Sequence, residues 1–345
     1  MKKIFALTLA VLMLLSLAAC GGKSNDTPTT PTTSSDPTTP TTPSDPGSSQ
    51  KKYTIGICQY MPHPALDAAT QGFKDAVTKE LGAENVTFNE QNAAGEASNC
   101  STIVNGLVSS KVDLIMANAT PAVAAAYNAT ETIPILGTSV TEYGAALGIK
   151  DFTGTVGENI SGTSDLADLD KQAQMIVDWF PTTKKVALLY CSGEPNSKFQ
   201  VNQVEAYLKG KNVECKMFGF ADTSDMMAVT TAACDYADVI YVPTDNTVAN
   251  NATAIDSICR AAKKPIIAGE AGICGGCGVA TMSIDYYDLG YATGMMAVKI
   301  LRDGADITKM PIEYAPKASY LYNEEICNAL GITPLTGYEK LVVED

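Results

Sequence analysis

Two cysteines have a spacing that is common in reactive thiol sites. Cys274 and Cys277 are separated by two glycines, as in redox-active dithiols and in one half of a zinc site. In thioredoxin-like proteins, however, the first cysteine begins a helix, whereas this pair lies in a Gly-rich segment that is predicted to be a loop before a strand. No second Cys-x-x-Cys occurs to complete a zinc site. We therefore interpret the pair as structural and predict no metal site.

The only histidine, His63, lies between Pro62 and Pro64. Such a residue can cap a turn, face solvent or contact a ligand. Any Ser-His-Asp or Cys-His site would have to depend on this residue alone, so hydrolase chemistry is not expected. The first predicted strand is not followed by a Gly-rich phosphate loop, which argues against a dinucleotide enzyme. These observations disfavour a hydrolase and a dinucleotide-dependent enzyme.

Short β-rich segments alternate with helical patterns from Tyr53 onward, which is typical of parallel α/β sheets. A helix over Ala68 to Leu81 would place Ala69, Phe73 and Val77 on one face. The segments with strand character are 53–58, 86–89, 114–117, 133–136, 186–190, 215–218, 239–242, 265–268 and 279–283.

A weak internal repeat indicates two similar halves. Residues 112–139 and 237–270 share one order: a strand, a polar loop, a helix, a strand that follows Pro, and a small polar loop. The alignment places Asp113 opposite Asp238 and Thr120 opposite Asp245. In open parallel sheets, ligands bind beyond the carboxyl ends of the strands. A cleft between two lobes would then be lined by Gln59, Thr120, Thr138, Ser139, Asn196, Thr244, Asp245, Asn246, Glu270 and Asp285.

The N-terminus has the features of an export signal. Lys2 and Lys3 precede a mostly apolar run that is too short to span a bilayer comfortably. The residues Leu17-Ala18-Ala19-Cys20 resemble the lipobox of bacterial lipoproteins, in which the cysteine becomes the lipidated N-terminus. Residues 23–50 contain six prolines and no apolar residue, which indicates a disordered spacer. We therefore expect a lipid-anchored protein on the extracytoplasmic face of the membrane.

Composition restricts the partners. The formal net charge of −14 disfavours nucleic acid and anionic lipid surfaces. Of the ten cysteines, nine remain after Cys20 is set aside, and they are scattered, often within apolar runs. We interpret most of them as buried free thiols rather than as a disulfide framework.

Four segments resemble one family of transport proteins. The sequences IGICQYMPHPALDAATQGFKDAV, VDLIMANATPAVAAA, IYVPTDNTVAN and IDYYDLGYATGMMAVKIL are similar to those of ABC-transporter substrate-binding lipoproteins that are grouped with tryptophan and tyrosine uptake systems. The resemblance extends from Tyr53 to Gly331. It implies a type I periplasmic-binding-protein fold, in which two lobes joined by three crossovers hold an amino acid or a similar small molecule.

A more distant resemblance, to branched-chain amino-acid-binding proteins, suggests roles for single residues. Their loops are similar to NATPAV, GTSVT and AGEAGI here. By this resemblance Thr120, Thr138, Ser139 and Thr141 would meet the ligand carboxylate, and Glu270 would take the ammonium. Compared with the closer relatives, the sequence lacks an acidic residue and Pro after GTSVTEYGAALG, and it adds CGGCG. The full predicted ligand-binding set is Gln59, Tyr60, His63, Thr120, Thr138, Ser139, Asn196, Asp245, Asn246, Glu270 and Asp285.

The resemblance also implies an organisation and partners. Residues 1–20 would be the signal peptide and 21–52 the linker. Lobe one would comprise 53–165 and about 287–311, and lobe two 166–286 and about 312–345. The resemblance implies a monomeric binding protein that is not an enzyme, has no cofactor, and delivers an amino acid to permease and ATPase subunits. We expect an aromatic amino acid, because Tyr60, Tyr143, Phe199 and Tyr286 lie in or beside cleft loops. The alternatives are a receptor for a nucleoside, sugar or signalling molecule and, from another class, a thiol-disulfide oxidoreductase that uses Cys274 and Cys277.

Overall fold

The computed structural model describes residues 51–315 and 317–342. The predicted signal peptide, Cys20 and all but the last two residues of the predicted linker lie outside the described residues. Within the described part of the chain, no helix is both long and apolar enough to cross a membrane.

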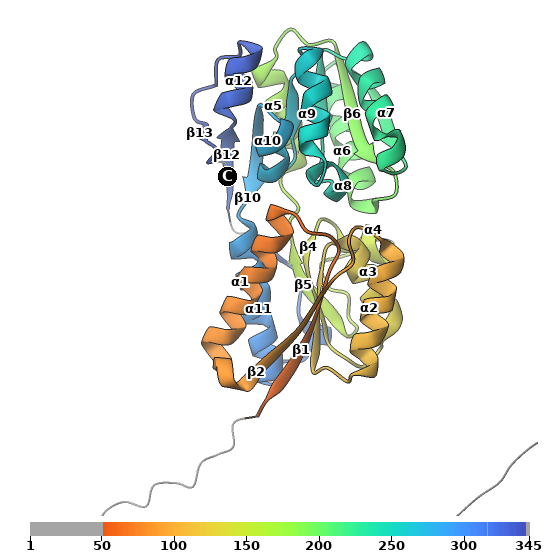
Figure 1. Ribbon diagram of the computed structural model, residues 1–345, viewed down its shortest axis with the longest axis vertical. Coiled ribbons are helices and arrows are strands. Elements are labelled where there is room, and N and C mark those ends of the chain that lie inside the picture. Colours follow the sequence, from red (N-terminus) through yellow and green to blue (C-terminus); the bar gives the residue numbers. More distant parts are fainter. Residues whose placement is uncertain (1–50, 316, 343–345) are drawn as a thin grey trace, which may run out of the picture. The chain divides into compact units, whose positions relative to one another are not determined.

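The strands form two separate sheets (Figure 1). The first sheet has the order β11-β5-β4-β3-β1-β2, and the second has the order β13-β12-β10-β9-β8-β6-β7. The strands are β1 Tyr53–Gln59, β2 Val86–Asn92, β3 Leu114–Asn118, β4 Ile135–Val140, β5 Ile160–Ser164, β6 Lys185–Cys191, β7 Glu214–Phe220, β8 Val239–Val242, β9 Ile266–Ala268, β10 Ala280–Ile284, β11 Glu313–Tyr314, β12 Ala318–Tyr322 and β13 Glu339–Lys340.

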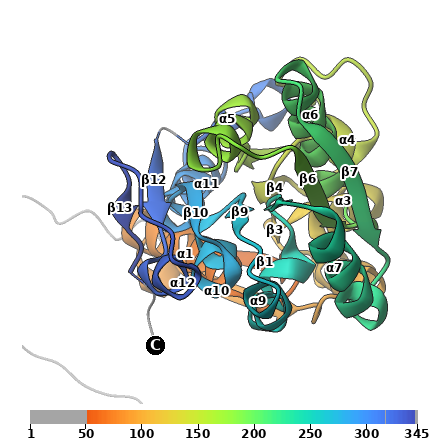
Figure 2. The ribbon, with the colours of Figure 1, turned by 90° about the horizontal axis from the view of Figure 1, so that it is seen from above.

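Helices cover both faces of each sheet. The first sheet belongs to lobe one and the second to lobe two. In lobe one, α1 and α11 pack on one face of the sheet, and α2 and α3 pack on the other. In lobe two, α5 and α6 lie on one face, and α7 and α9 on the other (Figure 2). The helices are α1 Pro64–Leu81, α2 Ala97–Ser109, α3 Thr120–Ala129, α4 Tyr143–Leu147, α5 Leu169–Trp179, α6 Pro195–Gly210, α7 Thr223–Tyr236, α8 Asn246–Ala249, α9 Ala252–Ala261, α10 Ala271–Cys277, α11 Tyr286–Leu301 and α12 Glu324–Leu330, with 3-10 turns at Ala83–Asn85 and Ile307–Lys309.

The two lobes repeat one strand order, as the internal repeat predicts. In lobe one the five parallel strands β1 to β5 are arranged 2-1-3-4-5, and β6 to β10 repeat this arrangement in lobe two. The aligned aspartates have the same role. Asp113 Oδ2 accepts a hydrogen bond of 2.8 Å from Thr54 N at the start of β1, and Asp238 Oδ2 accepts one of 3.0 Å from Lys185 N at the start of β6. The predicted fold class, two parallel-sheet α/β lobes, is confirmed.

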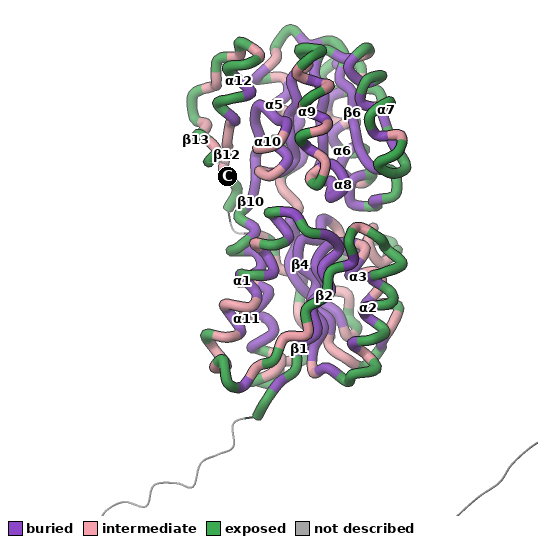
Figure 3. Tube along the Cα trace, viewed as in Figure 1, coloured by how far each residue is buried: buried purple, intermediate pink, exposed green. Residues whose placement is uncertain are grey.

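The central strands are buried on both sides, which explains why they appear as continuous apolar runs in the sequence (Figure 3). Ile55 and Ile57 of β1 face α1 and α11, whereas Cys58 faces α2. All nine predicted strands are present, with ends that differ by a few residues. The helix predicted from Ala68 begins earlier, at Pro64.

The second sheet departs from a purely parallel arrangement at its edge. Strand β12 pairs antiparallel with β10 through Met282 and Tyr320, among other residues. The chain passes between the lobes three times: after β5, after β10 and after β11. Because β11 pairs with β5, lobe one extends to residue 314 and not to about 311 as expected. With that change, we keep the predicted lobe boundaries as a proposal.

Candidate ligand-binding site between the lobes

A small cavity lies where the carboxyl ends of strands from both sheets meet. Its volume is about 10 Å³, which is about the room that one water molecule needs. The two lobes are therefore in close contact at this cavity. Apart from Ser139, which lies near the end of β4, every lining residue comes from a segment after a strand or from the helix that follows it, as expected for a parallel α/β fold. The lining residues are His63, Leu66, Ser139, Thr141, Asp165, Asn196, Thr244, Asp245, Asn246, Ala249, Glu270 and Tyr286.

Unpartnered polar atoms are concentrated at this cavity. Eight buried side-chain nitrogen or oxygen atoms in the described residues have no hydrogen-bond partner. Three of them, Ser139 Oγ, Asp165 Oδ1 and Asn196 Oδ1, belong to residues that line the cavity. A buried polar group without a partner costs roughly 1–3 kcal/mol, so such groups usually have a functional reason. These three atoms come from lobe one, from the first crossover and from lobe two.

The backbone at Ser139 brings its hydroxyl to this position. Strand β4 changes register against β5 between Gly137 and Val140, which is a β-bulge. Ser139 lies in the bulge with φ at 54°, a left-handed conformation that is unusual for a residue with a Cβ atom. Strain of this kind occurs most often at functional sites. The bulge therefore marks Ser139 as a candidate ligand contact.

Asp165 directly follows β5, where the chain first leaves lobe one. Its side chain is buried, and Oδ2 accepts a hydrogen bond of 2.9 Å from the hydroxyl of Tyr286. Burial raises the pKa of Asp165, and the side chains of Tyr286 and, less strongly, Thr141 oppose this effect. Oδ1 remains available to a donor from a ligand.

Asp245 and Glu270, which the sequence predicted as ligand contacts, accept hydrogen bonds from backbone N–H groups of the protein. Asp245 caps α8 through Val248 N and also accepts from Cys191 N at 2.7 Å. Glu270 caps α10, and its two oxygens accept from Gly272 N and Ile273 N. Burial is the main cause that raises the pKa of Asp245 to about 8 and that of Glu270 to about 7. For Asp245, repulsion from Glu194 adds to the shift.

Glu194 is a further buried acid beside the cavity, and both of its carboxylate oxygens accept hydrogen bonds. Its Oε1 accepts from the backbone and hydroxyl of Thr247, both at 2.8 Å. Its Oε2 accepts from the backbone and side chain of Asn246 and from Asn196 Nδ2. Glu194 thus fixes the amide side chains of Asn196 and Asn246, both of which line the cavity.

Two hydrogen bonds join the lobes across the cavity. His63 Nε2 lies 3.3 Å from Asn246 Oδ1, and Gln200 Nε2 donates to Thr141 Oγ1 at 3.5 Å. His63 is buried, and burial lowers the pKa of its imidazole. Burial between the lobes therefore favours the neutral form of the His63 imidazole.

Five of the eleven predicted ligand-binding residues do not line this cavity. Gln59 is bound within lobe one, since it donates to Asp67 at 2.6 Å and accepts from Thr70. Tyr60 packs in the apolar core. Thr138 is buried within β4 and faces Thr163. The other two are Thr120, buried at the start of α3, and Asp285, an exposed cap of α11.

The structure adds Leu66, Asp165 and Ala249 to the lining, which sequence analysis missed. Asp165 was missed because the strand before it, ISGTS, has no apolar run. Its small polar side chains are buried and paired: Thr163 contacts Thr293 at 2.8 Å, and Ser164 donates to Thr141 O. The sequence signal that could have identified Asp165 is an acidic residue directly after a segment of small polar residues. Of the four aromatic residues considered, only Tyr286 lines the cavity.

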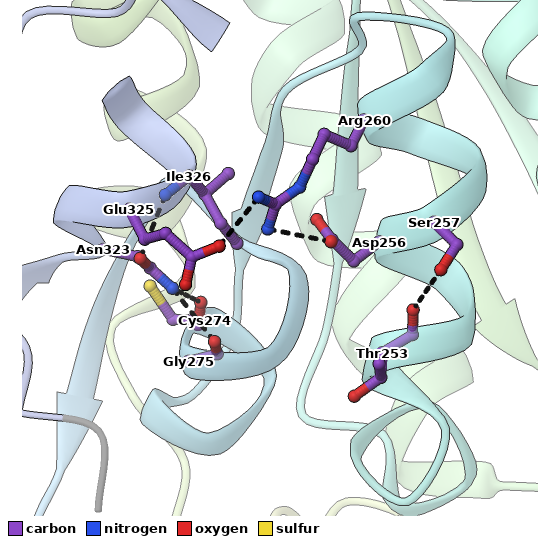
Figure 4. A network of polar contacts seen from close by, with 9 residues as sticks. All are labelled: Thr253, Asp256, Ser257, Arg260, Cys274, Gly275, Asn323, Glu325 and Ile326. Atoms are coloured by element: carbon purple, nitrogen blue, oxygen red, sulfur yellow. Dashed lines mark hydrogen bonds and ion pairs between the residues drawn. The ribbon is translucent and has the colours of Figure 1, made fainter. Parts of the chain in front are cut away.

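The Cys274 and Cys277 segment is helical, which corrects the predicted loop. Both residues lie in α10, and burial raises the pKa of each thiol. Asn323 ties the segment to the start of α12 by donating to Cys274 O at 3.1 Å and Gly275 O at 2.9 Å (Figure 4). A Cβ at Gly276 would lie 2.4 Å from that of Ala252, so this glycine permits close packing against α9. These features fit a structural role and disfavour a reactive dithiol.

Comparison with known proteins agrees with this geometry. The family described as ABC transporter substrate binding protein matches residues 54–343. The chain belongs to this family. A tyrosine-binding protein of Clostridioides difficile (strain R20291) is 34% identical over 290 residues, which cover 84% of each chain. Substrate-binding proteins of ABC transporters are extracytoplasmic and do not convert their solute, so this member is a binding protein and not an enzyme.

Two solved structures are also similar to this substrate-binding protein. An ABC domain from Streptococcus pneumonia in complex with L-Trp superposes with a TM-score of 0.80 at 29% identity, covering 85% of this chain and 100% of that one. A ligand-free, open substrate-binding protein with adhesive properties from Clostridium difficile gives 0.66 at 34% identity, with the same coverage. The lower score against the open structure, despite the higher identity, fits lobes that are closed here.

Proposed function

We propose that this substrate-binding protein binds an aromatic amino acid between its lobes for an ABC importer. The observation that carries the proposal is the set of three unpartnered atoms on Ser139, Asp165 and Asn196 around one cavity. The relatives support the ligand class, because one is named for tyrosine and another was solved with L-Trp.

The ammonium group of the ligand would bind Asp165. Among the described residues, no lysine or arginine lines the cavity, whereas three carboxyl groups do. Glu270 and Asp245 use both of their oxygens for backbone N–H groups, but Asp165 has a free one. A charge-assisted hydrogen bond in a buried site is stronger than a neutral one. We therefore place the ammonium at Asp165, and not at Glu270 as the family resemblance suggested.

The other two unpartnered atoms fit the rest of a zwitterion. Ser139 can donate its hydroxyl to the ligand carboxylate, while Asn196 Oδ1 can accept a second N–H of the ammonium. Leu66, Ala249 and the Tyr286 ring offer apolar surface for a side chain. Because the closed cavity is far smaller than an amino acid, the lobes must open at the crossovers to admit one.

A thermal-shift screen of the purified chain tests the ligand class. L-Tyr, L-Trp and L-Phe should raise the melting temperature, since a ligand at 100 times its Kd adds roughly 2.7 kcal/mol of stability. L-Leu, a nucleoside and a sugar serve as comparisons. A shift with the nucleoside or the sugar, and with no amino acid, would support the alternative receptor instead.

We further propose that Cys20 is lipidated and holds the protein at the membrane. The support is the lipobox resemblance at Leu17-Ala18-Ala19-Cys20 and the Pro-rich segment that follows. Cys20→Ser should release the protein from the membrane or leave its signal uncut, as fractionation and intact mass would show. Full membrane attachment of the processed variant would refute the anchor.

A further inference from the structure

The fold brings together cysteines that the Cys-x-x-Cys motif does not mark. Cys234 on α7 and Cys259 on α9 are 25 residues apart, and their sulfur atoms lie 3.6 Å apart in hydrogen-bond contact. Cys274 and Cys277, by contrast, are not hydrogen-bonded to one another, and Cys274 Sγ donates to Gly278 O within its own segment. All nine cysteines in the described residues are free thiols.

We propose that Cys234 and Cys259 are an oxidation site, at which a disulfide cross-links α7 to α9. The two helices lie side by side on one face of the second sheet (Figures 1 and 2). Both side chains are buried in an apolar cluster that also contains Cys191, Cys274 and Cys277, and within this cluster Cys234 and Cys259 are the two thiols that are hydrogen-bonded to one another. The protein works outside the cytoplasm, which is where protein disulfides form and persist.

The environment of the pair gives the two thiols different roles. Pairing with Cys259 lowers the pKa of Cys234, with Lys264 as a further cause, although burial opposes both. The same pairing, together with burial, raises the pKa of Cys259. Cys234 also lies in the last turn of α7, which ends at Tyr236, and helix ends open more easily than their centres. Cys234 is therefore the thiol that reacts first, and Cys259 is the one that resolves the intermediate.

The oxidant is a small or protein disulfide, R–S–S–R. The Cys234 thiolate attacks one sulfur of this disulfide, which forms a mixed disulfide and releases one thiolate RS⁻. Cys259 loses its proton and attacks the Cys234 sulfur, which forms the Cys234–Cys259 bond and releases the second RS⁻. The two protons end on the released thiols, so two RSH form while the protein loses two hydrogen atoms.

The test is a disulfide map of the full-length protein after exposure to oxidised glutathione. Free thiols are alkylated under denaturing conditions, and the chain is digested with trypsin and Asp-N without reduction. This digestion places the two cysteines in separate peptides with one cysteine each, 225–234 and 256–260. We expect these two peptides to be linked and to separate on reduction. The mapping is needed because Cys58 and Cys100 are also hydrogen-bonded and add their own mass change if they couple.

Stability gives a second measurement. A cross-link that closes a loop of this length restricts the unfolded chain, so the melting temperature should rise by about 5 °C on oxidation. Cys234→Ser should abolish both the link and the rise. Cys327→Ser is the matched control, because Cys327 is buried with only a backbone carbonyl as its partner, and this variant should keep both effects. Complete alkylation of Cys234 and Cys259 in the oxidised wild type, or a link from Cys259 to Cys277 instead, would overturn the proposal whatever the variants do.

Discussion

The hydroxyl of Tyr286 donates a hydrogen bond of 2.9 Å to Oδ2 of Asp165, and this bond joins two of the three crossovers between the lobes. Asp165 follows β5, and Tyr286 opens α11 after β10. The ligand atom that binds Oδ1 of Asp165 would thus contact a group that the hinge itself holds in place.

Tyr286→Phe should weaken ligand binding without unfolding the protein. The variant keeps the ring but leaves Oδ2 of Asp165 without its donor, and a hydrogen bond to a charged group contributes about 1.5–3 kcal/mol. We expect Kd for L-Tyr to rise about tenfold in calorimetry. An unchanged Kd, with an unchanged melting temperature of the ligand-free protein as the control, would show that the pair has no part in binding.

Ser139→Ala should affect the recognition of the carboxylate alone. Removal of the hydroxyl deletes one donor, so Kd for L-Tyr should rise about five- to tenfold, equivalent to roughly 1–1.4 kcal/mol. Tyramine, which has the amine and the ring but no carboxylate, is the matched control ligand and should bind the variant and the wild type equally. Equal losses for both ligands would place the effect in the shape of the β-bulge and not in the hydroxyl.

The buried acids predict a pH dependence of stability. Glu270 has a pKa of about 7 in the folded protein, above its ordinary value, so folding binds a proton. This contribution is complete below about pH 4 and is lost as pH rises through 7. Asp245 should extend the loss to about pH 8. His63, whose pKa is lowered, has the opposite sign, because its contribution is lost as pH falls below about 6.5.

The measurement is the free energy of unfolding of the ligand-free protein between pH 5 and 8, compared with Glu270→Gln. The wild type should lose on the order of a few kcal/mol over this range, and the variant clearly less, because its amide does not titrate. The difference between the two proteins isolates Glu270 from His63 and Asp245. If the free energies of unfolding of the two proteins changed in parallel with pH, the assignment of a raised pKa to Glu270 would be contradicted.

Close packing of α1 against α11 depends on glycine. A Cβ at Gly290 would lie 1.9 Å from Ala69 O, which side-chain rotation cannot relieve. Gly290→Ala should therefore lower the free energy of unfolding by roughly 2 kcal/mol or more. Gly106 on α2 is the matched control, since a Cβ there meets no atom within 4 Å. Gly106→Ala should be neutral or stabilise by up to about 1 kcal/mol, and equal effects of both changes in denaturant unfolding would refute the packing argument.

Sequence patterns predicted the strands that are apolar and buried on both faces, such as β1 and β3, because burial on two sides requires continuous apolar residues. They missed β5, whose buried residues are small and polar and are satisfied by contacts between segments such as Thr163 and Thr293. Those contacts depend on the assembled fold, so local patterns do not reveal them.

Local sequence patterns also identified only part of the candidate ligand-binding site. Ser139, Asn196 and the acids after β8 and β9 were predicted, because a parallel sheet brings its strand ends together. Thr138 was expected beside Ser139 but points into the sheet, since side chains alternate along a strand. The sequence did not reveal which acid has a free oxygen. The structure shows that Asp245 and Glu270 use their oxygens to cap α8 and α10.

Calorimetry of L-Tyr and L-Trp with the wild type, Asp165→Asn and Glu270→Gln tests the central claim most directly. The asparagine keeps the shape of Asp165 but removes the charge that we assign to the ammonium, so Kd should rise at least tenfold, or about 1.4 kcal/mol. Glu270→Gln should change Kd by less than about threefold at pH 7.5, because both Glu270 oxygens already serve α10. Wild-type affinity in Asp165→Asn together with a large loss in Glu270→Gln would contradict this account and return the ammonium to Glu270.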